Sequence, residues 1–385
     1  MALVRMGRAA RIGAGTAALL AISCVTPPRE PIPRAAPATG IETSIILIGD
    51  AGAPDASREP VLRALVEELA SASSPSIVVF LGDNIYPKGM PQPGEGGRAE
   101  AERRLDAQVD AVLESGATGI FIPGNHDWNF AGSGGRARVI EAERFGVDRG
   151  SGRVSFVPGN GCPGPVGIDV GAVARLILLD TQWWLDAAFD SPVSLADCPT
   201  RSASEVLDSL GVLLEADGRA TIVAGHHPLI TYGAHGGFFN LRQHLFPLTD
   251  LKSWLWIPLP VIGSAYPFAR THGITNQDVS GPRYRRMLEV LDSVFAVSPP
   301  LVYAAGHEHA IQILDGGGAR VDVVSGAGIY GHVGPVTRGP ATIYHAGGGS
   351  GYVRLDVQRD GRVRLAVVIV DAEGGRSEPY SAFLR

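Results

Sequence analysis

Five apolar runs of this 385-residue chain end in the same way, with a glycine followed at once by a residue that can bind a metal ion. The segments are Ile48-Gly49-Asp50, Leu81-Gly82-Asp83, Pro123-Gly124-Asn125, Ala224-Gly225-His226 and Ala305-Gly306-His307. The carboxyl ends of parallel strands gather at one edge of a sheet, and glycine there permits a positive φ or a close backbone approach. Any single segment of this kind could be an ordinary turn in a chain with 50 glycines, but five in one chain predict donor groups that converge on one rim.

The rest of the chain alternates between strand-like and helix-like segments. Short β-rich runs predict strands at Ser44–Ile48, Ser76–Leu81, Gly119–Ile122, Ala174–Leu179, Ala220–Ala224 and Leu301–Ala305. Candidate helices lie near residues 59–72, 99–115, 137–145, 203–215 and 283–296. This alternation predicts an α/β sandwich whose buried strands are largely parallel. Asp360-Gly361 is a hairpin turn signal, so we expect a closing β-hairpin over residues 351–371.

Residues 236–282 interrupt this alternation with an insertion that is rich in aromatic residues and poor in charge. Its aromatic side chains are Phe238, Phe239, Phe246, Trp254, Trp256, Tyr266 and Phe268. Long loops inside compact domains often form lids or binding surfaces. We therefore expect a lid or a membrane-facing surface, with a satellite core packed against the sandwich as the alternative.

The amino terminus resembles a targeting segment. Three arginines precede an apolar run, Ile12–Ser23, that is too short to span a bilayer. The following Cys24 completes a sequence similar to a bacterial lipoprotein cleavage box. We expect a signal peptide over residues 1–23, a lipidated Cys24, a proline-rich linker over 25–41 and a domain over 42–385. The protein would then be exported and anchored in a bacterial envelope, periplasmic or at the surface; plain secretion and an uncleaved anchor are the alternatives.

Charge and cysteine content narrow the range of partners. The net charge is −6, and removing the three arginines of the first 23 residues makes it about −9, so nucleic-acid binding is not expected. A small phosphorylated substrate remains compatible, because a bound metal can reverse the local field. Cys162 and Cys198 form either one disulfide or two buried thiols, and the sequence leaves both open.

The residues around the five glycines carry a family resemblance. They form the blocks GDAG at 49–52, GDNIY at 82–86, GNHD at 124–127, VAGH at 223–226 and GHEH at 306–309. In order and context these blocks resemble those of the calcineurin-like metallophosphoesterases, especially the purple acid phosphatases of the small tartrate-resistant type. VAGHHP, followed by His235, and VVSGAG at 323–328 extend the likeness, which covers roughly residues 42–330. The resemblance implies a four-layer αββα sandwich with a dinuclear metal site at the carboxyl ends of its strands.

The resemblance also implies which side chains bind the two metals. The first metal would be bound by Asp50, Asp83, Tyr86 and His309, and the second by Asp83, Asn125, His226 and His307, with Asp83 bridging. Carboxylate and phenolate oxygens suit Fe(III), whereas imidazole and amide groups suit Fe(II), Zn(II) or Mn(II). Other calcineurin-like enzymes usually place a histidine two residues after the first aspartate. Here that position is Gly52, and Tyr86 is available in its place.

The implied reaction is hydrolysis of a phosphomonoester by a metal-activated hydroxide. His126, oriented by Asp127, would stabilise the transition state or protonate the leaving group, and His235 would face it across the pocket. One alternative is a phosphodiesterase, or a nucleotide or lipid-phosphate hydrolase, that uses the same site. Another is a non-catalytic extracytoplasmic binding lipoprotein.

Overall fold

The computed structural model describes residues 34–186, 195–215, 218–250 and 254–384. The expected signal peptide and the lipidation site at Cys24 lie outside these residues. Part of the expected linker is described, and there the Ala35 amide donates a hydrogen bond to the carbonyl of Ser381 at 3.0 Å. Within the described residues, no helix is both long enough and apolar enough to cross a membrane.

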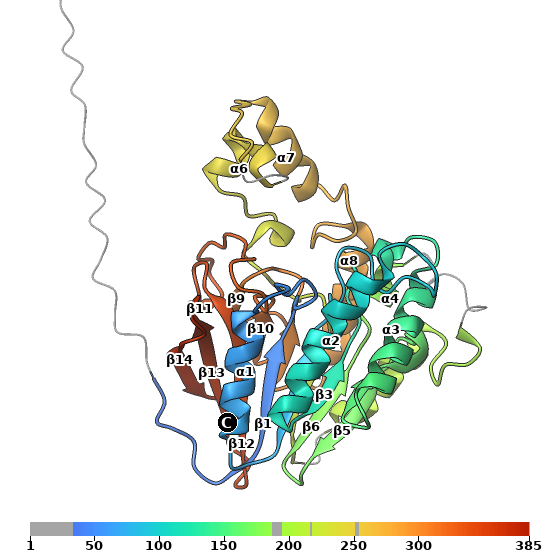
Figure 1. The fold of residues 1–385 in the computed structure, drawn as a ribbon, viewed down its shortest axis with the longest axis vertical. Helices are drawn as coiled ribbons and strands as arrows, with labels where there is room; N and C mark the ends of the chain where they lie inside the picture. Colours follow the sequence, from blue (N-terminus) through green and yellow to red (C-terminus); the bar gives the residue numbers. More distant parts are fainter. Residues whose placement is uncertain (1–33, 187–194, 216–217, 251–253, 385) are drawn as a thin grey trace, which may run out of the picture. The chain divides into compact units, whose positions relative to one another are not determined.

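Among the described residues, two seven-stranded sheets form the centre of the fold (Figure 1). The first has the order β14-β13-β12-β1-β2-β3-β4. Its strands are β1 (Ile41–Ile48), β2 (Ser76–Phe80), β3 (Thr118–Phe121), β4 (Val154–Phe156), β12 (Ser350–Gln358), β13 (Val363–Val370) and β14 (Arg376–Phe383). Strands β1 to β4 pair in parallel, whereas β12, β13 and β14 extend the sheet by antiparallel pairing from β1.

The second sheet has the order β11-β9-β10-β8-β7-β6-β5. Its strands are β5 (Val166–Val170), β6 (Ala174–Leu178), β7 (Ala220–Ala224), β8 (Val302–Ala305), β9 (Ile311–Leu314), β10 (Val321–Ser325) and β11 (Thr342–His345). The four central strands β10, β8, β7 and β6 are parallel, and the remaining strands pair antiparallel with their neighbours. Each sheet therefore contains a run of four parallel strands, whose carboxyl ends form a rim.

Helices cover the outer face of each sheet. The first sheet packs against α1 (Pro60–Ala70), α2 (Arg98–Ser115) and α3 (Gly135–Arg149). The second packs against α4 (Gln182–Leu185), α5 (Ala203–Leu214) and α8 (Pro282–Phe295). A third core fills the space between the two sheets. The predicted α/β class and four-layer αββα sandwich are confirmed.

Strand β1 shows why its sequence is a continuous apolar run. Ile45 and Leu47 enter the core between the sheets, whereas Ile46 and Ile48 enter the core beneath the helices. Successive side chains of a strand point to opposite faces, and here both faces are buried. Helix α5 begins where Ser202 accepts a hydrogen bond from the Glu205 amide at 3.2 Å, an N-cap that satisfies one of the free amides of the first turn.

The structure decides between the two alternatives for the cysteines and adds strands that were not predicted. Cys162 and Cys198 form a disulfide, which excludes the alternative of two buried thiols. Strands β12 and β13 pair around Asp360-Gly361, and β14 adds a further strand that the sequence analysis did not identify. The residues of β14 include Ser377, Glu378, Pro379 and Ser381, which lack the apolar alternation of a half-buried strand.

The insertion contains two short helices, α6 (Leu241–Leu245) and α7 (Ala265–Thr271), joined by irregular turns. Figure 1 shows both helices beyond the rim formed by the strand ends. Most of its large apolar side chains are exposed; Trp254 is 72% and Phe268 is 63% accessible. Exposure at this level excludes Trp254 and Phe268 from a satellite core, whereas Phe238 does pack against the sandwich, with its ring 5.1 Å from that of Tyr232.

Candidate metal centre

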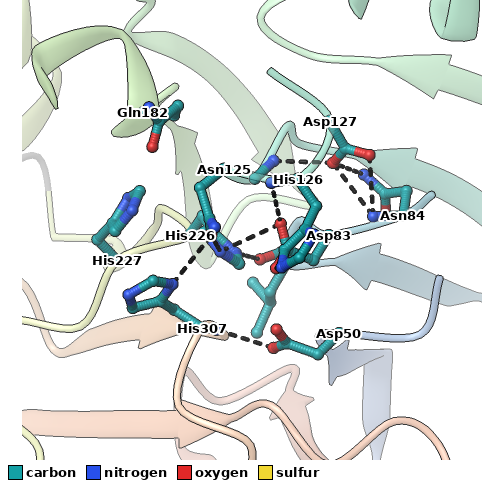
Figure 2. Close-up of polar contacts among 12 residues, drawn as sticks. Asp50, Asp83, Asn84, Asn125, His126, Asp127, Gln182, His226, His227 and His307 are labelled. Carbon is teal, nitrogen blue, oxygen red and sulfur yellow. Dashed lines mark hydrogen bonds and ion pairs between the residues drawn. The ribbon is translucent and has the colours of Figure 1, made fainter. Parts of the chain in front are cut away.

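The loops that follow β1, β2, β3, β7 and β8 bring the five predicted segments to one place. Figure 2 shows Asp50, Asp83, Asn125, His226 and His307 directed toward a common centre. These strands belong to the parallel runs of the two sheets, so the site lies where both carboxyl rims meet. The remaining two predicted ligands, Tyr86 and His309, contact Asp50 at the same rim.

The glycines allow this convergence mainly through close packing. A Cβ on Gly49 would lie 2.9 Å from the Cα of Gly306, and one on Gly124 would lie 2.3 Å from the amide nitrogen of Asp83. A side chain at either position would force the ligand loops apart. The predicted positive φ occurs at Gly82 and, unexpectedly, at Asp50, Asp83 and His307 themselves, with φ of 58°, 54° and 67°. Backbone strain of this kind costs of order 1–3 kcal/mol per residue and is often found at functional sites.

Asp50, Tyr86 and His309 form an oxygen-rich cluster. The Tyr86 hydroxyl lies 3.1 Å from Asp50 Oδ1 and 3.0 Å from His309 Nε2, and those two atoms are 3.4 Å apart. Donor atoms that surround one ion at roughly 2.0–2.2 Å lie about 3–3.5 Å from one another. The three donor atoms therefore have the spacing of one side of a coordination shell.

Asn125, His226 and His307 form a nitrogen-rich cluster. His226 Nδ1 donates to the carbonyl of Leu81 at 2.7 Å, which leaves its Nε2 lone pair 2.8 Å from Asn125 Oδ1. His307 Nε2 donates to the carbonyl of Gln277 at 2.7 Å, which leaves its Nδ1 lone pair 3.0 Å from the same oxygen. Two imidazole lone pairs and an amide oxygen at this separation repel one another unless a cation lies between them.

Asp83 lies between the two clusters. Its Oδ1 is 3.5 Å from His226 Nε2 and accepts a hydrogen bond from the His126 amide at 2.8 Å. Its charge also acts on the Tyr86 phenol, where it helps to raise the pKa. Asp50, Asp83 and His226 offer ligand atoms that all lie within 4.8 Å of one another. A carboxylate at this position can bridge two ions.

Burial sets the protonation of the ligands. Burial, with the neighbouring His235, lowers the pKa of His307 well below its usual range, so that imidazole is neutral and able to bind a metal. Burial, with the charges of Asp50 and Asp83, raises the pKa of Tyr86 well above its usual range. The Tyr86 phenol therefore loses its proton only beside a strong positive charge such as a metal ion.

His126 and Asp127 are arranged differently from the prediction. Asp127 is buried and accepts hydrogen bonds from the amides of Asn84, Ile85 and Gly124 at 2.8–3.1 Å. His126 Nδ1 instead contacts the carbonyl of Pro87 at 2.7 Å. The prediction that Asp127 orients His126 is therefore wrong: the Asp127 carboxylate ties together the loops that follow β2 and β3, as Figure 2 shows.

His235 lies beside the nitrogen-rich cluster, with its ring 3.9 Å from that of His307. Its Nδ1 is 3.0 Å from the Asp278 carboxylate and 3.0 Å from the Gln277 carbonyl. Arg270 forms an ion pair with Asp278 and lies 3.1 Å from the same His235 nitrogen. His235 is thus held by residues from the base of the insertion.

Most of the residues that support the ligands carry no motif and could not be identified from the sequence blocks. The Gln277 carbonyl accepts from His307, and its side chain links His227 to Gln182. Residues 236–282 contain only two acidic residues, and this rarity could have marked Asp278 as a residue with a specific role. Glu308, inside the GHEH block, accepts hydrogen bonds from the Thr231 hydroxyl and the His235 amide.

Comparisons with known proteins agree with this geometry. A family model described as calcineurin-like phosphoesterase matches residues 43–310. A search of curated proteins found no match. The fold is similar to that of GAP50, the anchor in the inner membrane complex of Plasmodium, at 13% identity and a TM-score of 0.52 over 88% of each chain.

The fold is also similar to that of the purple acid phosphatase PPD1 from yellow lupin (Lupinus luteus) seeds, at 13% identity and a TM-score of 0.51. That alignment covers 88% of this chain and 53% of the lupin chain. At such identities the two structures show a common fold alone. The family match spans most of the sandwich and contains all seven predicted ligands, and it indicates metal-dependent phosphoester hydrolysis at a dinuclear site. The chain belongs to the calcineurin-like phosphoesterase family.

Proposed function

We propose that this protein is a phosphomonoesterase of the purple-acid-phosphatase type that acts on a small phosphorylated substrate. Asp50, Asp83, Tyr86 and His309 would bind Fe(III), and Asp83, Asn125, His226 and His307 would bind Fe(II), Zn(II) or Mn(II). Carboxylate and phenolate oxygens favour the harder trivalent ion, and imidazole nitrogens favour the softer divalent one. When bound, the two ions would withdraw charge from the phosphoryl oxygens and lower the pKa of a water molecule.

The observation that carries this proposal is the pairing of Gly52 with Tyr86. A Cβ on Gly52 would lie 2.4–2.5 Å from backbone atoms of Asp83, Asn84 and Ile85, so a histidine does not fit at this position. The Tyr86 amide donates to the Gly52 carbonyl at 3.1 Å, which fixes the start of the loop that carries the phenol. The Tyr86 phenol then supplies the donor that a histidine at position 52 would otherwise provide.

His126 is the proposed proton donor to the leaving group. Its Nδ1 contacts the Pro87 carbonyl, so the ring is held while its Nε2 lies 3.8 Å from Asp83 Oδ2 at the edge of the centre. The side chain is 20% exposed, which gives it access to both substrate and solvent. His235, beside the other cluster, is proposed to contact the phosphoryl group. Both roles need only proton transfer and hydrogen bonding from the chain's own side chains.

We also propose that the protein is exported, as the amino-terminal sequence suggests. The Cys162–Cys198 disulfide supports an oxidising compartment, because such bonds are rare where thiol reductants are abundant. The lipid anchor at Cys24 remains a prediction, checked by labelled-lipid incorporation into wild type and Cys24→Ser.

Metal analysis combined with visible spectroscopy tests the proposed function. The purified protein should contain iron and absorb visible light through charge transfer from the tyrosinate to Fe(III). Tyr86→Phe should lose this band but keep part of its activity, whereas Tyr344→Phe, outside the site, should keep both. A panel of phosphomonoesters and phosphodiesters should show preference for monoesters. A colourless, fully active protein with zinc or manganese in both positions would place the chain in another branch of the family.

A further inference from the structure

Exposed apolar side chains are concentrated in the insertion. Of the 18 exposed large hydrophobic residues in the described chain, ten lie within residues 236–282. Six of them, which we call the apolar tip, are Trp254, Trp256, Ile257, Val261, Ile262 and Phe268. Their exposed fractions range from 49% to 88%. Single exposed apolar residues are common on protein surfaces, but a concentration of this kind marks an interaction surface.

The apolar tip is held by an ordered framework. The Leu259 amide donates to the Leu245 carbonyl at 2.8 Å, and His244 Nδ1 contacts the Ser264 hydroxyl at 3.0 Å. A Cβ on Gly263 would lie 2.2 Å from the His244 carbonyl oxygen, so the turn after Val261 packs closely on α6. These contacts fix the positions from which the apolar side chains project into solvent.

Val261 is the most exposed member of the tip, at 88%, and its backbone has a φ of 69°. A β-branched residue is strongly disfavoured in this region, where glycine or asparagine would be less strained. Val261 gains no burial within the chain that would offset this strain. Its exposure in a strained turn is explained if the side chain enters an apolar environment outside the chain.

The charge of this segment is opposite to that of the rest of the chain. The insertion, residues 236–282, contains three basic residues and two aspartates, whereas the other 338 residues contain 30 basic and 37 acidic residues. Arg242, on α6, and Arg285 and Arg286, at the start of α8, are exposed. Exposed tryptophans in a segment of net positive charge are typical of surfaces that enter the interfacial region of an anionic bilayer.

We propose that the apolar tip docks on an anionic lipid bilayer. Each of its side chains exposes 49% or more of its surface, a shape that a fluid apolar phase can surround and that a protein partner would have to match with several pockets. Helices α6 and α7 lie beyond the rim (Figure 1), and the base of the insertion holds His307 through Gln277. Docking would therefore place the metal-centre rim on the side of the protein that faces the lipid. This inference goes beyond the proposed function and stands whether or not the site is catalytic.

Quenching of tryptophan fluorescence on vesicles tests the proposal in the full chain. The measurement reports on the insertion itself, so its result does not depend on whether the amino terminus carries a lipid. Trp128, Trp183 and Trp184 are buried, so quenching from outside reports on Trp254 and Trp256. With vesicles of equimolar phosphatidylcholine and phosphatidylglycerol, brominated lipid chains should quench this emission. Acrylamide quenches this emission in solution, and its quenching constant should fall several-fold on these vesicles. Phosphatidylcholine vesicles alone should give weaker effects at equal lipid.

Two variants keep the measurement specific. A double variant, Trp254→Ser with Trp256→Ser, should lose both effects, because only the buried tryptophans remain. Val297→Trp in that background introduces a reporter at an exposed position between α8 and β8, at the amino end of a strand and so on the opposite rim. This reporter should stay accessible to acrylamide and unquenched by lipid. The proposal is overturned if Trp254 and Trp256 stay accessible on both vesicles, or if Val297→Trp is quenched equally.

Discussion

The oxygen-rich and nitrogen-rich clusters share Asp83, but different parts of the chain support them. Tyr86 is fixed by sandwich residues, since its amide donates to Gly52 and its carbonyl accepts from Arg104 of α2 at 2.7 Å. His307 depends instead on the carbonyl of Gln277, at the base of the insertion. One cluster is thus built into the sandwich, whereas the other is completed by a segment that interrupts it.

This difference separates the properties that each cluster should control. Supporting hydrogen bonds orient metal ligands, and their loss commonly weakens metal affinity by roughly 10–100-fold. Changes in the insertion should therefore act first on the second metal, and changes near α2 on the first. Asp83 belongs to both clusters, so a change at this residue should affect binding of both metals.

Asp83→Asn is accordingly the variant with the largest expected effect. It removes the carboxylate charge that lies between the two clusters, so both metals should be lost and turnover should fall to nearly nothing. Metal content and phosphatase rate measured on the same preparation check this. Asp322→Asn, which changes a buried carboxyl bonded to the Gly317 amide away from the centre, is the matched control for folding. Two bound metals with a wild-type rate in Asp83→Asn would reject a bridging role.

The oxygen-rich cluster was accessible from sequence because its residues belong to short local blocks. Asp50, Asp83 and Tyr86 each follow a buried strand within a few residues, and parallel strands bring their carboxyl ends together whatever the connecting helices contain. Apolar runs and their alternation likewise predicted most of the parallel strands and of the helices that cover them. They did not predict β14, because its polar residues show little periodicity.

The support of the nitrogen-rich cluster was not accessible in this way. Gln277 acts on His307 through its backbone carbonyl, which no side-chain pattern reports. Asp127 has the right sequence position to orient His126, but backbone amides of two loops take up its carboxylate. Such contacts follow from the three-dimensional path of loops, and spacing along the chain does not determine that path.

His126→Ala should have the next largest effect and should separate catalysis from metal binding. The His126 side chain is outside both clusters, so metal content should not change, while turnover should fall by roughly 10²–10⁴. The loss should shrink for aryl phosphates, whose leaving groups need less protonation. His272→Ala, an exposed histidine bonded to the Phe268 carbonyl, should leave turnover unchanged. Equal losses on alkyl and aryl substrates would argue against a leaving-group acid.

Asp278→Asn should have the smallest effect on turnover and should act on one cluster only. Asp278 pairs with Arg270 and contacts His235, and its backbone adjoins the Gln277 carbonyl that holds His307. The variant should therefore weaken binding of the second metal by roughly 10-fold while the visible band of the first remains. Titration of the divalent metal, followed together with absorbance, checks this. Loss of the band at the same metal concentration would show that the two clusters share their support.

The same variant carries a pH dependence with a defined sign. Burial opposes ionisation, but Arg270 and His235 outweigh it and hold the pKa of Asp278 below its ordinary value. The carboxylate therefore stabilises the fold above its unfolded pKa of about 4, and this contribution is lost as the pH falls through the lower folded value. Breaking this buried ion pair should cost about 3 kcal/mol near neutral pH. Urea unfolding in chelator should show a difference from wild type that shrinks near pH 3, whereas Asp360→Asn, in an exposed pair with Arg362, should change stability little at either pH. A difference that is constant with pH would mean that Asp278 stabilises the insertion by shape and not by charge.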